Sequence, residues 1–463
     1  MSKALTYFFC GIGGSGMMPL AVLLHKKGHI VRGSDRAYDQ GQTPDKFQAL
    51  IDLGIQIFPQ DGCAVTESMD YLVVSTAIEN SIPDVAKALS LGISIVKRGQ
   101  LLAELFNASH AKIAVAGTSG KSTVTGMIGT MLIEIGRDPT VVNGGEIINF
   151  RNGHNDKFAG IRKGSDDLFI AEMDESDGSV AHYNPTISLL NNIALDHMSM
   201  EELERLFGDY LSRTEGSIIA NYDQPRVKGL CADMDDIISY SHKDNAVDLF
   251  AKDITPQVNG INFTLVFNGH DYPVGLSVPG KHNVENALAA LCVCAAMDID
   301  IVQGIKGIEA FKGIHRRMEL IGSKGGVTVY DDFGHNPDKI SASLETLKSF
   351  DGRLIVMFQP HGFGPLRLMG NEMIDVFAHY LDDNDVLIMP EVYYAGGTVD
   401  RSVTAQHIIE RAKERGVNAH WFATRDEINP FLGEQAKPED RIVIMGARDD
   451  TLHVFANEIL ELF

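Results

Sequence analysis

Residues 112–123 read KIAVAGTSGKST, and this stretch indicates the fold of the middle of the chain. An apolar β-type run at 112–116 leads into a loop with two glycines and then into a helical stretch at about 124–135. A strand, a glycine loop carrying Lys-Ser and a helix are the parts of a phosphate-binding loop, whose backbone N–H groups cradle phosphates. Lys121 would reach the terminal phosphates, and the hydroxyl of Ser122 would bind magnesium. Val115 replaces the first glycine of the usual G-x-x-x-x-G-K-[ST] pattern, so the loop is a variant.

A second glycine-rich turn lies near the start of the chain. The apolar run 5–10 enters GIGGSG at 11–16, a helical stretch follows at 17–27, and a second apolar strand, 29–35, ends at Asp35. This order is the fingerprint of a Rossmann-like unit, in which an acidic residue reaches a ribose hydroxyl. The motif alone leaves NAD and a uridine diphosphate both open, and Asp35 could instead be only a turn residue.

The last part of the chain alternates apolar strands with helical segments. Strand candidates lie at 326–330, 354–358, 386–389 and 442–445. This alternation indicates another mostly parallel sheet. We therefore expect an α/β protein of three domains: a Rossmann-like domain at 1–108, a central P-loop ATPase-like domain with a mostly parallel sheet at 109–317, and a C-terminal Rossmann-like α/β domain at 318–463.

The composition limits the classes of partner. The 463 residues carry a formal net charge of −22, which argues against binding to nucleic acid or to an anionic membrane surface, where phosphates must be neutralised. Five scattered cysteines indicate reduced thiols and a cytoplasmic protein. The apolar run 4–24 is interrupted by four glycines, so a strand, a turn and a helix explain it better than membrane insertion.

Motifs along the chain resemble those of the Mur ligase family, in the family's order and spacing. The matching stretches are GTSGKS at 117–122, AEMDESD at 171–177, NIALDH at 192–197, GKHNVENA at 280–287, RRME at 316–319, DDFGHNP at 331–337 and FQPH at 358–361. The opening GIGGSGM at 11–17 also resembles the turn with which the alanine-adding and peptide-recycling branches hold a uridine diphosphate.

The resemblance implies an ATP-dependent carboxylate–amine ligase of peptidoglycan synthesis, with ATP and Mg²⁺ required. The substrates would be UDP-N-acetylmuramate and a free amino acid, L-alanine being the expected one, joined through an acyl phosphate. A recycled peptide or another amino acid is the alternative within the class. From other classes, an NAD-dependent oxidoreductase explains only the first block, and an inactive nucleotide-binding protein would be expected to have lost Lys121 or Glu172. The oligomeric state is left open.

The resemblance also implies roles for individual residues. Lys121, Glu172 and His197 would be catalytic, and Ser122, Glu172 and His197 would hold the metal. The ATP-binding residues would be Gly117, Thr118, Ser119, Gly120, Lys121, Ser122, Thr123, Asn283, Asn286, Arg317 and Asp332. The UDP-sugar would be held by Gly11, Ile12, Gly13, Gly14, Ser15, Gly16, Met17 and Asp35, and the amino-acid side of the site would contain His335, His361 and Arg367.

Each assignment has a plainer alternative. Glu172 lies in an acidic run that could simply be solvated, and His197 alone would more often be a structural histidine. Asn283 and Asn286 could cap or cross-link a helix, and the basic pair at 316–317 could be solvated.

Departures from the family pattern concentrate on the amino-acid side. Ser119 and Asn336 stand where the alanine-adding branch usually has histidine, and 360–367 and 390–397 match that branch poorly. No lysine occurs at 210–215, near the place of the lysine that other branches carbamylate. The ligase chemistry is unaffected, and the identity of the amine stays open.

Overall fold

The chain contains three sheets that fall into two compact units. The structure, a computed structural model, describes residues 3–75, 78–152, 156, 158–175, 178–194, 198–257, 259–394, 400–449 and 451–463. The first unit comprises 1–253, 263–274 and 282–312, and the second comprises 254–262, 275–281 and 313–463. Each unit is described separately.

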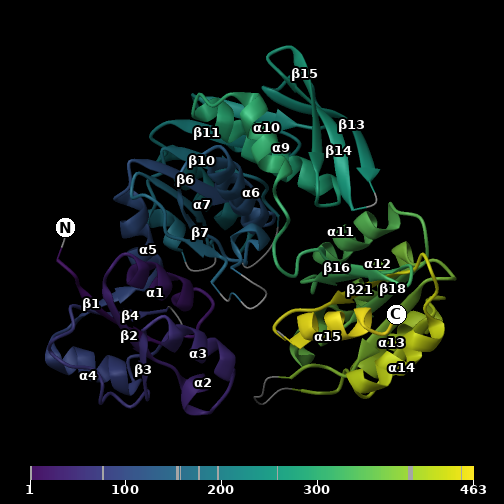
Figure 1. The fold of residues 1–463 in the computed structure, drawn as a ribbon, viewed down its shortest axis with the longest axis horizontal. Helices are drawn as coiled ribbons and strands as arrows, with labels where there is room; N and C mark the ends of the chain where they lie inside the picture. Colours follow the sequence, from purple (N-terminus) through teal and green to yellow (C-terminus); the bar gives the residue numbers. More distant parts are fainter. Residues whose placement is uncertain are drawn as a thin grey trace. The chain divides into compact units, whose positions relative to one another are not determined.

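The first sheet opens the chain and has five parallel strands in the order β3-β2-β1-β4-β5 (Figure 1). Its elements are β1 (Thr6–Cys10), α1 (Met17–Lys26), β2 (Ile30–Ser34), α2 (Arg36–Asp39), α3 (Pro44–Asp52), β3 (Gln56–Phe58), β4 (Tyr71–Val74), α4 (Pro83–Leu91), β5 (Ser94–Lys97) and α5 (Arg98–Asn107). Side chains alternate between its faces, as a strand's period of two requires. Tyr7 and Phe9 join the core that includes α1 and α5, while Phe8 and Cys10 join a separate core against α4.

The second sheet has ten strands in the order β15-β14-β13-β12-β11-β10-β6-β9-β7-β8. Its strands are β6 (Ala111–Ala116), β7 (Thr140–Val142), β8 (Ile161–Arg162), β9 (Leu168–Glu172), β10 (Ile187–Leu190), β11 (Ser217–Asn221), β12 (Ile237–Ser241), β13 (Leu249–Gln257), β14 (Gly260–Phe267) and β15 (His270–Leu276). The helices of this region are α6 (Lys121–Glu134), η1 (Ile148–Phe150), η2 (Ser179–His182), α7 (Met200–Ser212), α8 (Pro225–Leu230), α9 (Lys281–Ala296) and α10 (Ile301–Glu309). The strands from β7 through β9, β6, β10, β11 and β12 to β13 pair in parallel, and the short β8 is paired antiparallel to β7.

The third sheet lies in the second unit and has six strands in the order β16-β17-β21-β18-β19-β20. Its elements are β16 (Glu319–Lys324), β17 (Val327–Asp332), α11 (Pro337–Lys348), β18 (Leu354–Phe358), α12 (Phe363–Tyr380), β19 (Val386–Pro390), α13 (Ala405–Glu414), β20 (Ala419–Phe422), η3 (Arg425–Glu427), α14 (Ile428–Gln435), β21 (Arg441–Met445) and α15 (Thr451–Leu460). Only β16 and β17 are antiparallel. Val443 and Met445 pack with α11, α12 and α13, whereas Ile442 and Ile444 pack with α14 and α15, so helices cover both faces.

The expected α/β class with mostly parallel sheets is confirmed. The run 4–24 forms β1, a glycine turn and α1, as its glycines predicted. Helix α6 begins at Lys121, three residues earlier than expected from the apolar pattern, because Val124 N already donates to Gly120 O at 2.9 Å. Within the described part of the chain, no helix combines the length and the apolar character that crossing a bilayer requires.

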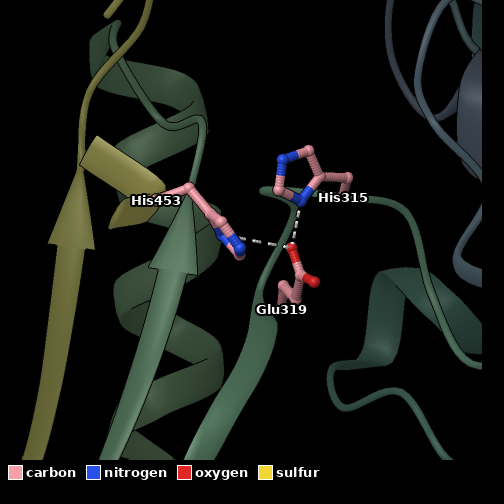
Figure 2. A group of neighbouring side chains, drawn as sticks. All are labelled: His315, Glu319 and His453. Carbon is pink, nitrogen blue, oxygen red and sulfur yellow. Dashed lines mark hydrogen bonds and ion pairs between the residues drawn. The ribbon is translucent and has the colours of Figure 1, made fainter. Parts of the chain in front are cut away.

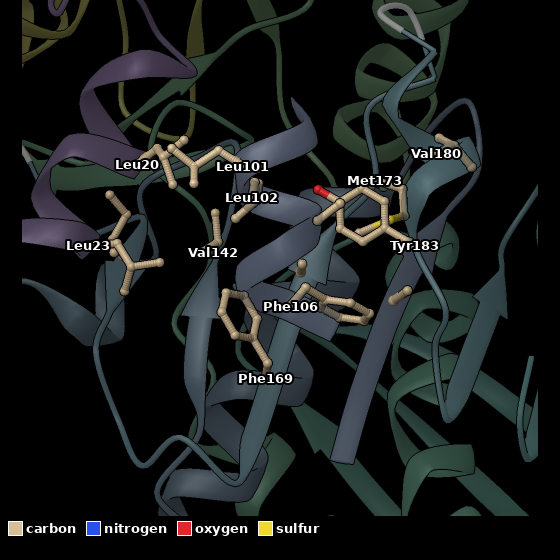
Figure 3. Close-up of a cluster of buried hydrophobic side chains, with 14 of the residues drawn as sticks. Leu20, Leu23, Leu101, Leu102, Phe106, Val142, Phe169, Met173, Val180 and Tyr183 are labelled. Carbon is tan, nitrogen blue, oxygen red and sulfur yellow. The ribbon is translucent and has the colours of Figure 1, made fainter. Parts of the chain in front are cut away.

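Three aromatic rings join α5 of the first sheet to the second sheet within the first unit (Figure 3). The Phe106 ring meets Phe169 of β9 edge-on at 5.6 Å between centroids, and Tyr183 at 5.1 Å. All three side chains are buried. Such pairs stabilise beyond the area they bury, so this cluster fixes where the first sheet ends against the second.

Phe106→Ala should lower the free energy of unfolding of the first unit by about 3–5 kcal/mol, because it deletes a buried ring and leaves a cavity. Phe106→Leu, which keeps most of the volume, should cost less than about 1.5 kcal/mol. Urea unfolding followed by circular dichroism measures both. Leu89→Ala on α4 is the control, since Leu89 is 55% exposed. An equal, small loss for Phe106→Ala and Leu89→Ala would contradict the role given to the cluster.

Candidate active site

Residues from four separate segments meet at one edge of the second sheet. In the register of the strands, Val115 of β6 pairs with Glu172 of β9, and Ala116 pairs with Leu190 of β10. The strands are parallel, so their carboxyl ends share an edge, which is where open α/β sheets bind ligands. The loop 117–120, Glu172, the pair 191–192 and the turn after β7 are thereby brought together.

The two glycines of the loop 117–120 occupy positions where a side chain would not fit. Gly117 (φ 135°) and Gly120 (φ 80°) have positive φ angles. A Cβ at Gly120 would lie 2.5 Å from Asn191 Nδ2 and 2.7 Å from Asn286 Oδ1. Glycine is therefore required here both by the left-handed backbone and by the packing. Helix α6 starts directly after the loop, so the N–H groups of its first turn could bind a phosphate.

Asparagine side chains hold this loop in shape. Asn192 Oδ1 accepts from Ser119 N at 2.8 Å and from Thr118 Oγ1 at 3.0 Å. Asn191 Nδ2 donates to Ser119 O at 3.2 Å, and Asn191 Oδ1 accepts from the buried Tyr240 hydroxyl at 2.6 Å. Satisfied amides of this kind fix a loop before any ligand arrives.

Helix α9 supplies the next layer of the same network. Asn286 Oδ1 accepts from Asn191 Nδ2 at 3.2 Å, and Asn286 Nδ2 donates to Asn283 Oδ1 at 3.1 Å. Both α9 asparagines are buried, and Asn286 ties the helix to Asn191, which in turn bonds the phosphate loop at Ser119. This is the plainer alternative considered for them from the sequence, and it leaves room for a contact with ATP as well.

Lys121 is held by the protein itself. Its Nζ donates to Gly117 O at 2.7 Å and forms an ion pair with Glu175 at 2.8 Å. Glu175 is buried, and the side chain of Lys121 is only 13% exposed. A buried carboxylate that orients this ammonium can be exchanged for a phosphate oxygen.

Ser122 and Glu172 form a pair of oxygen ligands beside Lys121. Ser122 Oγ donates to Glu172 Oε2 at 2.7 Å, and Gly144 N donates to the same oxygen at 2.7 Å. Hydroxyl and carboxylate oxygens are the ligands that Mg²⁺ prefers, so the donor set fits this ion. Glu172 is therefore not a member of a freely solvated acidic run. His197, the third expected ligand, lies outside the described residues.

The first sheet positions its own glycine turn in a similar way. Gly11 N and Ile12 N both donate to Ser34 O of β2, and Gly13 N donates to Asp35 Oδ2 at 2.8 Å. The other carboxylate oxygen of Asp35 accepts from Ala37 N and caps α2. Asp35 is thus a turn residue and an anchor of the glycine turn at once.

In the second unit, the two arginines at 316–317 differ sharply. Arg316 is buried, pairs with Asp331 at 3.3 Å, and donates to the carbonyls of Gly446 and Asp449 at 2.8 and 3.0 Å. The side chain of Arg317 is exposed. The solvated-pair alternative is therefore wrong for Arg316, which is structural.

The expected nucleotide ligand Asp332 is already held at three points. It is buried and accepts from Met318 N, Gly334 N and Ser343 Oγ at 2.9, 3.0 and 2.7 Å. Burial raises the pKa of its carboxyl above the ordinary value. The bond from Met318 N fixes the backbone directly after the exposed Arg317.

The carboxyl edge of the third sheet brings together two of the three residues expected on the amino-acid side. The rings of His335 and His361 meet edge-on at 5.3 Å. Burial first, then the neighbouring His335 and Arg448, lower the pKa of His361 from 6.5 to about 4. Arg367 lies on α12, where Nη1 forms a surface ion pair with Asp400 at 2.8 Å.

A cavity of about 390 Å³ opens at the same edge of the third sheet. It is lined by Gln359, Pro390, Glu391, Tyr393, Ala423, Thr424, Arg425, Asp449 and Thr451. Gln359 Nε2 donates to Asp449 Oδ2 at 2.6 Å, and Arg425 Nη1 lies 3.5 Å from the same oxygen. The cavity thus presents both carboxylates and a guanidinium.

Family models match the chain along most of its length. "Mur ligase family, catalytic domain" matches 6–110, "Mur ligase middle domain" matches 115–294, and "Mur ligase, glutamate ligase domain" matches 316–448. The UDP-N-acetylmuramate–L-alanine ligase of Agathobacter rectalis is 33% identical over 96% of both chains, and that of a Sulfurihydrogenibium species is 33% identical over 98% and 99%. The chain belongs to the Mur ligase family. It is an ATP-dependent, Mg²⁺-using enzyme that forms amide bonds.

Solved structures agree on the fold of this Mur ligase. The UDP-N-acetylmuramate–alanine ligase of Thermotoga maritima superposes with a TM-score of 0.80 at 23% identity, covering 99% and 98% of the chains. A murein peptide ligase from Psychrobacter arcticus superposes with a TM-score of 0.68 at 25% identity and the same coverage. The expected three-domain Mur ligase architecture is confirmed. Family membership also rules out the dehydrogenase interpretation of the glycine turn.

Several residues of this Mur ligase site could not be chosen from the sequence. Glu175, the partner of Lys121, is one acidic residue in a run of four and is singled out only by the fold. The sequence around Arg425 carries no motif, and its place in the cavity depends on the segments after β20 and β21 reaching the same edge of the sheet. A signal did exist for Asn192, which follows an apolar strand directly.

Gly120→Ala should weaken ATP binding at least about tenfold, because the added Cβ collides with Asn191 and Asn286 and displaces the loop. Gly136→Ala is the matched control, since Gly136 also has positive φ (84°) but has nothing within 4 Å of its Cβ position. Calorimetric titration with a non-hydrolysable ATP analogue measures both. Equal affinities in the two variants would show that the collision does not matter.

The lowered pKa of His361 predicts a loss of stability in acid. Its pKa is about 4 in the folded protein and 6.5 ordinarily, so the unfolded chain takes up this proton at a higher pH than the folded protein does. Above pH 6.5 the histidine is neutral in both states and does not change the free energy of unfolding. That free energy then falls as the pH drops from 6.5 toward about 4. The stability difference between the wild type and His361→Gln should therefore shift against the wild type between pH 7 and pH 4, in urea unfolding. A ring titration by NMR with a midpoint at or above pH 6.5 would contradict this.

Proposed function

We propose that this ligase joins the carboxylate of UDP-N-acetylmuramate to the amino group of L-alanine, with conversion of ATP to ADP and phosphate, in peptidoglycan synthesis. The curated relatives from Agathobacter rectalis and a Sulfurihydrogenibium species carry that name and align over nearly the whole chain. We also propose domain boundaries at 1–108, 109–317 and 318–463 and, from the five free cysteines, a cytoplasmic location.

The observation that carries the proposal is the group formed by Lys121, Ser122 and Glu172. One ammonium and two oxygen ligands lie at the start of a helix, beside a glycine loop with no room for a Cβ. This arrangement fits a nucleotide triphosphate with Mg²⁺ and has no purpose in a protein that only binds a sugar nucleotide.

The reaction requires two displacements. A carboxylate oxygen of the sugar attacks the γ-phosphorus of ATP, and the bond to the ADP oxygen breaks. The amine then attacks the acyl carbon, phosphate leaves with the bonding electrons, and the nitrogen loses a proton to give the amide. Negative charge gathers on phosphoryl oxygens in both steps, so the site must supply positive charge and donors.

The residues of the phosphate loop fit the first displacement. Lys121 would exchange Glu175 for the β- and γ-phosphates, while the N–H groups of 117–123 hold the phosphate chain. Ser122, Glu172 and His197 would hold Mg²⁺, which supplies neutralisation of phosphate charge when bound. Asn283, Asn286, Arg317 and Asp332 are proposed as the further ATP contacts.

The other two substrates are assigned to the other two sheets. The turn from Gly11 to Met17, with Asp35 behind it, would take the uridine diphosphate at the start of α1. His335 and His361 would face the amine, and we infer that its side chain enters the cavity beside His361. The lowered pKa keeps this histidine neutral at pH 7, so a ring nitrogen can accept a hydrogen bond from the amine. Arg367 stays a candidate for the amino acid's carboxylate.

Phosphate release from ATP tests the proposal. With UDP-N-acetylmuramate present, L-alanine should stimulate release far more than any other amino acid or a recycled murein peptide, and mass spectrometry should identify the amide. Lys121→Ala should abolish release with every amine while leaving the circular dichroism spectrum unchanged. Stimulation by a different amine would retain the ligase chemistry and overturn L-alanine as the substrate. Near-normal activity of Lys121→Ala would overturn the phosphate-loop assignment.

A further inference from the structure

Two histidines and a glutamate converge in the second unit. His315 lies before β16, Glu319 begins β16, and His453 lies on α15. Figure 2 shows both imidazole rings directed at the same carboxylate. His315 Nδ1 lies 2.6 Å from Glu319 Oε2, and His453 Nδ1 lies 3.9 Å from it. The three ligand atoms all lie within 4.8 Å of one another.

We propose that His315, Glu319 and His453 form a binding site for a divalent transition-metal ion of the zinc class, separate from the Mg²⁺ of the ligase reaction. Imidazole nitrogens with one carboxylate favour Zn²⁺, Co²⁺ or Ni²⁺ over Mg²⁺, which prefers oxygen alone. In a tetrahedral zinc site, ligand atoms at about 2.0–2.2 Å from the ion lie roughly 3.3 Å apart. Small side-chain rotations therefore bring this group to the required spacing.

The charges around the cluster favour a cation. Asp331 is fully buried, and its Oδ2 lies 3.1 Å from His453 Nδ1, so it offers a further oxygen ligand. Asp331 also pairs with the buried guanidinium of Arg316, whereas Glu319 is bonded by the backbone N–H of Arg316 and by His315. Two carboxylates thus lie beside the two imidazoles, and both would attract a bound cation.

The surroundings also orient the ligands, as second-layer groups do in metal sites. Glu319 Oε2 accepts from Arg316 N at 2.8 Å, which fixes the carboxylate. The side chains of His315 and His453 are 19% and 28% exposed, so solvent can complete the coordination. When Nδ1 of each ring binds the ion, its proton would be carried by Nε2.

The ion would lock a strained turn. Arg316 (φ 56°) and Met318 (φ 48°) both adopt the left-handed conformation that non-glycine residues avoid. His315 and Glu319 lie at the two ends of this turn, and His453 ties it to α15. The exposed Arg317 lies between them. A bound metal would also change ATP affinity through Arg317, and this second effect rests on the proposed function. Binding of the metal itself does not.

Cobalt spectroscopy on the full-length enzyme tests the site. After chelator treatment, and with millimolar Mg²⁺ present to occupy the phosphate-loop site, one equivalent of Co²⁺ should produce d–d absorption between about 500 and 650 nm, typical of four-coordinate cobalt with N and O ligands. Zn²⁺ should displace it. His453→Gln and Glu319→Gln should each weaken Zn²⁺ binding at least about tenfold. Glu319→Gln retains an acceptor for Arg316 N, so its fold is the less disturbed of the two.

The matched control is a second cluster in the first unit, made by Asp223, His242 and Glu285. His242→Gln should leave the cobalt band and the Zn²⁺ affinity unchanged. Zn²⁺ should also raise the Tm of the wild type by a few degrees and leave that of His453→Gln unchanged. The proposal is overturned if Zn²⁺ binds the wild type and His453→Gln equally, if neither binds it at 10 μM or below, or if only His242→Gln loses the band.

Discussion

The parallel register of β6 with β9 and β10 is the constraint on which the active site depends. It places Ala116 beside Leu190 and Val115 beside Glu172, so segments more than fifty residues apart in the sequence end at one edge. Once the strands are fixed, the loop after β6, the carboxylate that ends β9 and the amides after β10 meet without further adjustment. A shift of one residue would turn Glu172 to the other face of the sheet and remove it from Ser122.

This dependence on strand register explains which features could be predicted from the sequence and which could not. The glycine loops, their strands and their helices follow from local patterns, and the expected class and most strands proved right. The roles of individual residues could be predicted only where they belong to a recognised motif. Glu175 is one carboxylate among several in its run, and its pairing with Lys121 depends on a turn after β9 that no local pattern specifies. Asn286 looked like either an ATP ligand or a helix cross-link, and the structure shows the cross-link directly.

Arg316 and Arg317 show why adjacent, like-charged residues resist prediction. In the sequence they form one basic pair. In the fold, a left-handed turn at Arg316 sends its guanidinium inward to Asp331 and two carbonyls, while Arg317 stays exposed. Burying a guanidinium is tolerable only with such complete pairing. The buried Arg316 therefore stabilises the fold, and the exposed Arg317 is the one proposed to contact ATP.

The segments that depart from the alanine-adding pattern lie at one edge of the third sheet. The segments 360–367 and 390–397 follow the carboxyl ends of β18 and β19, where an isolated bridge joins His361 to Tyr393. Gln359, Glu391 and Tyr393 from these ends line the cavity, together with Arg425 and Asp449. In the proposed function, the phosphate loop with Lys121, Ser122 and Glu172 lies at the second sheet instead. Selection of the amine can thus change with the loops of the third sheet while the acid-activating machinery stays the same.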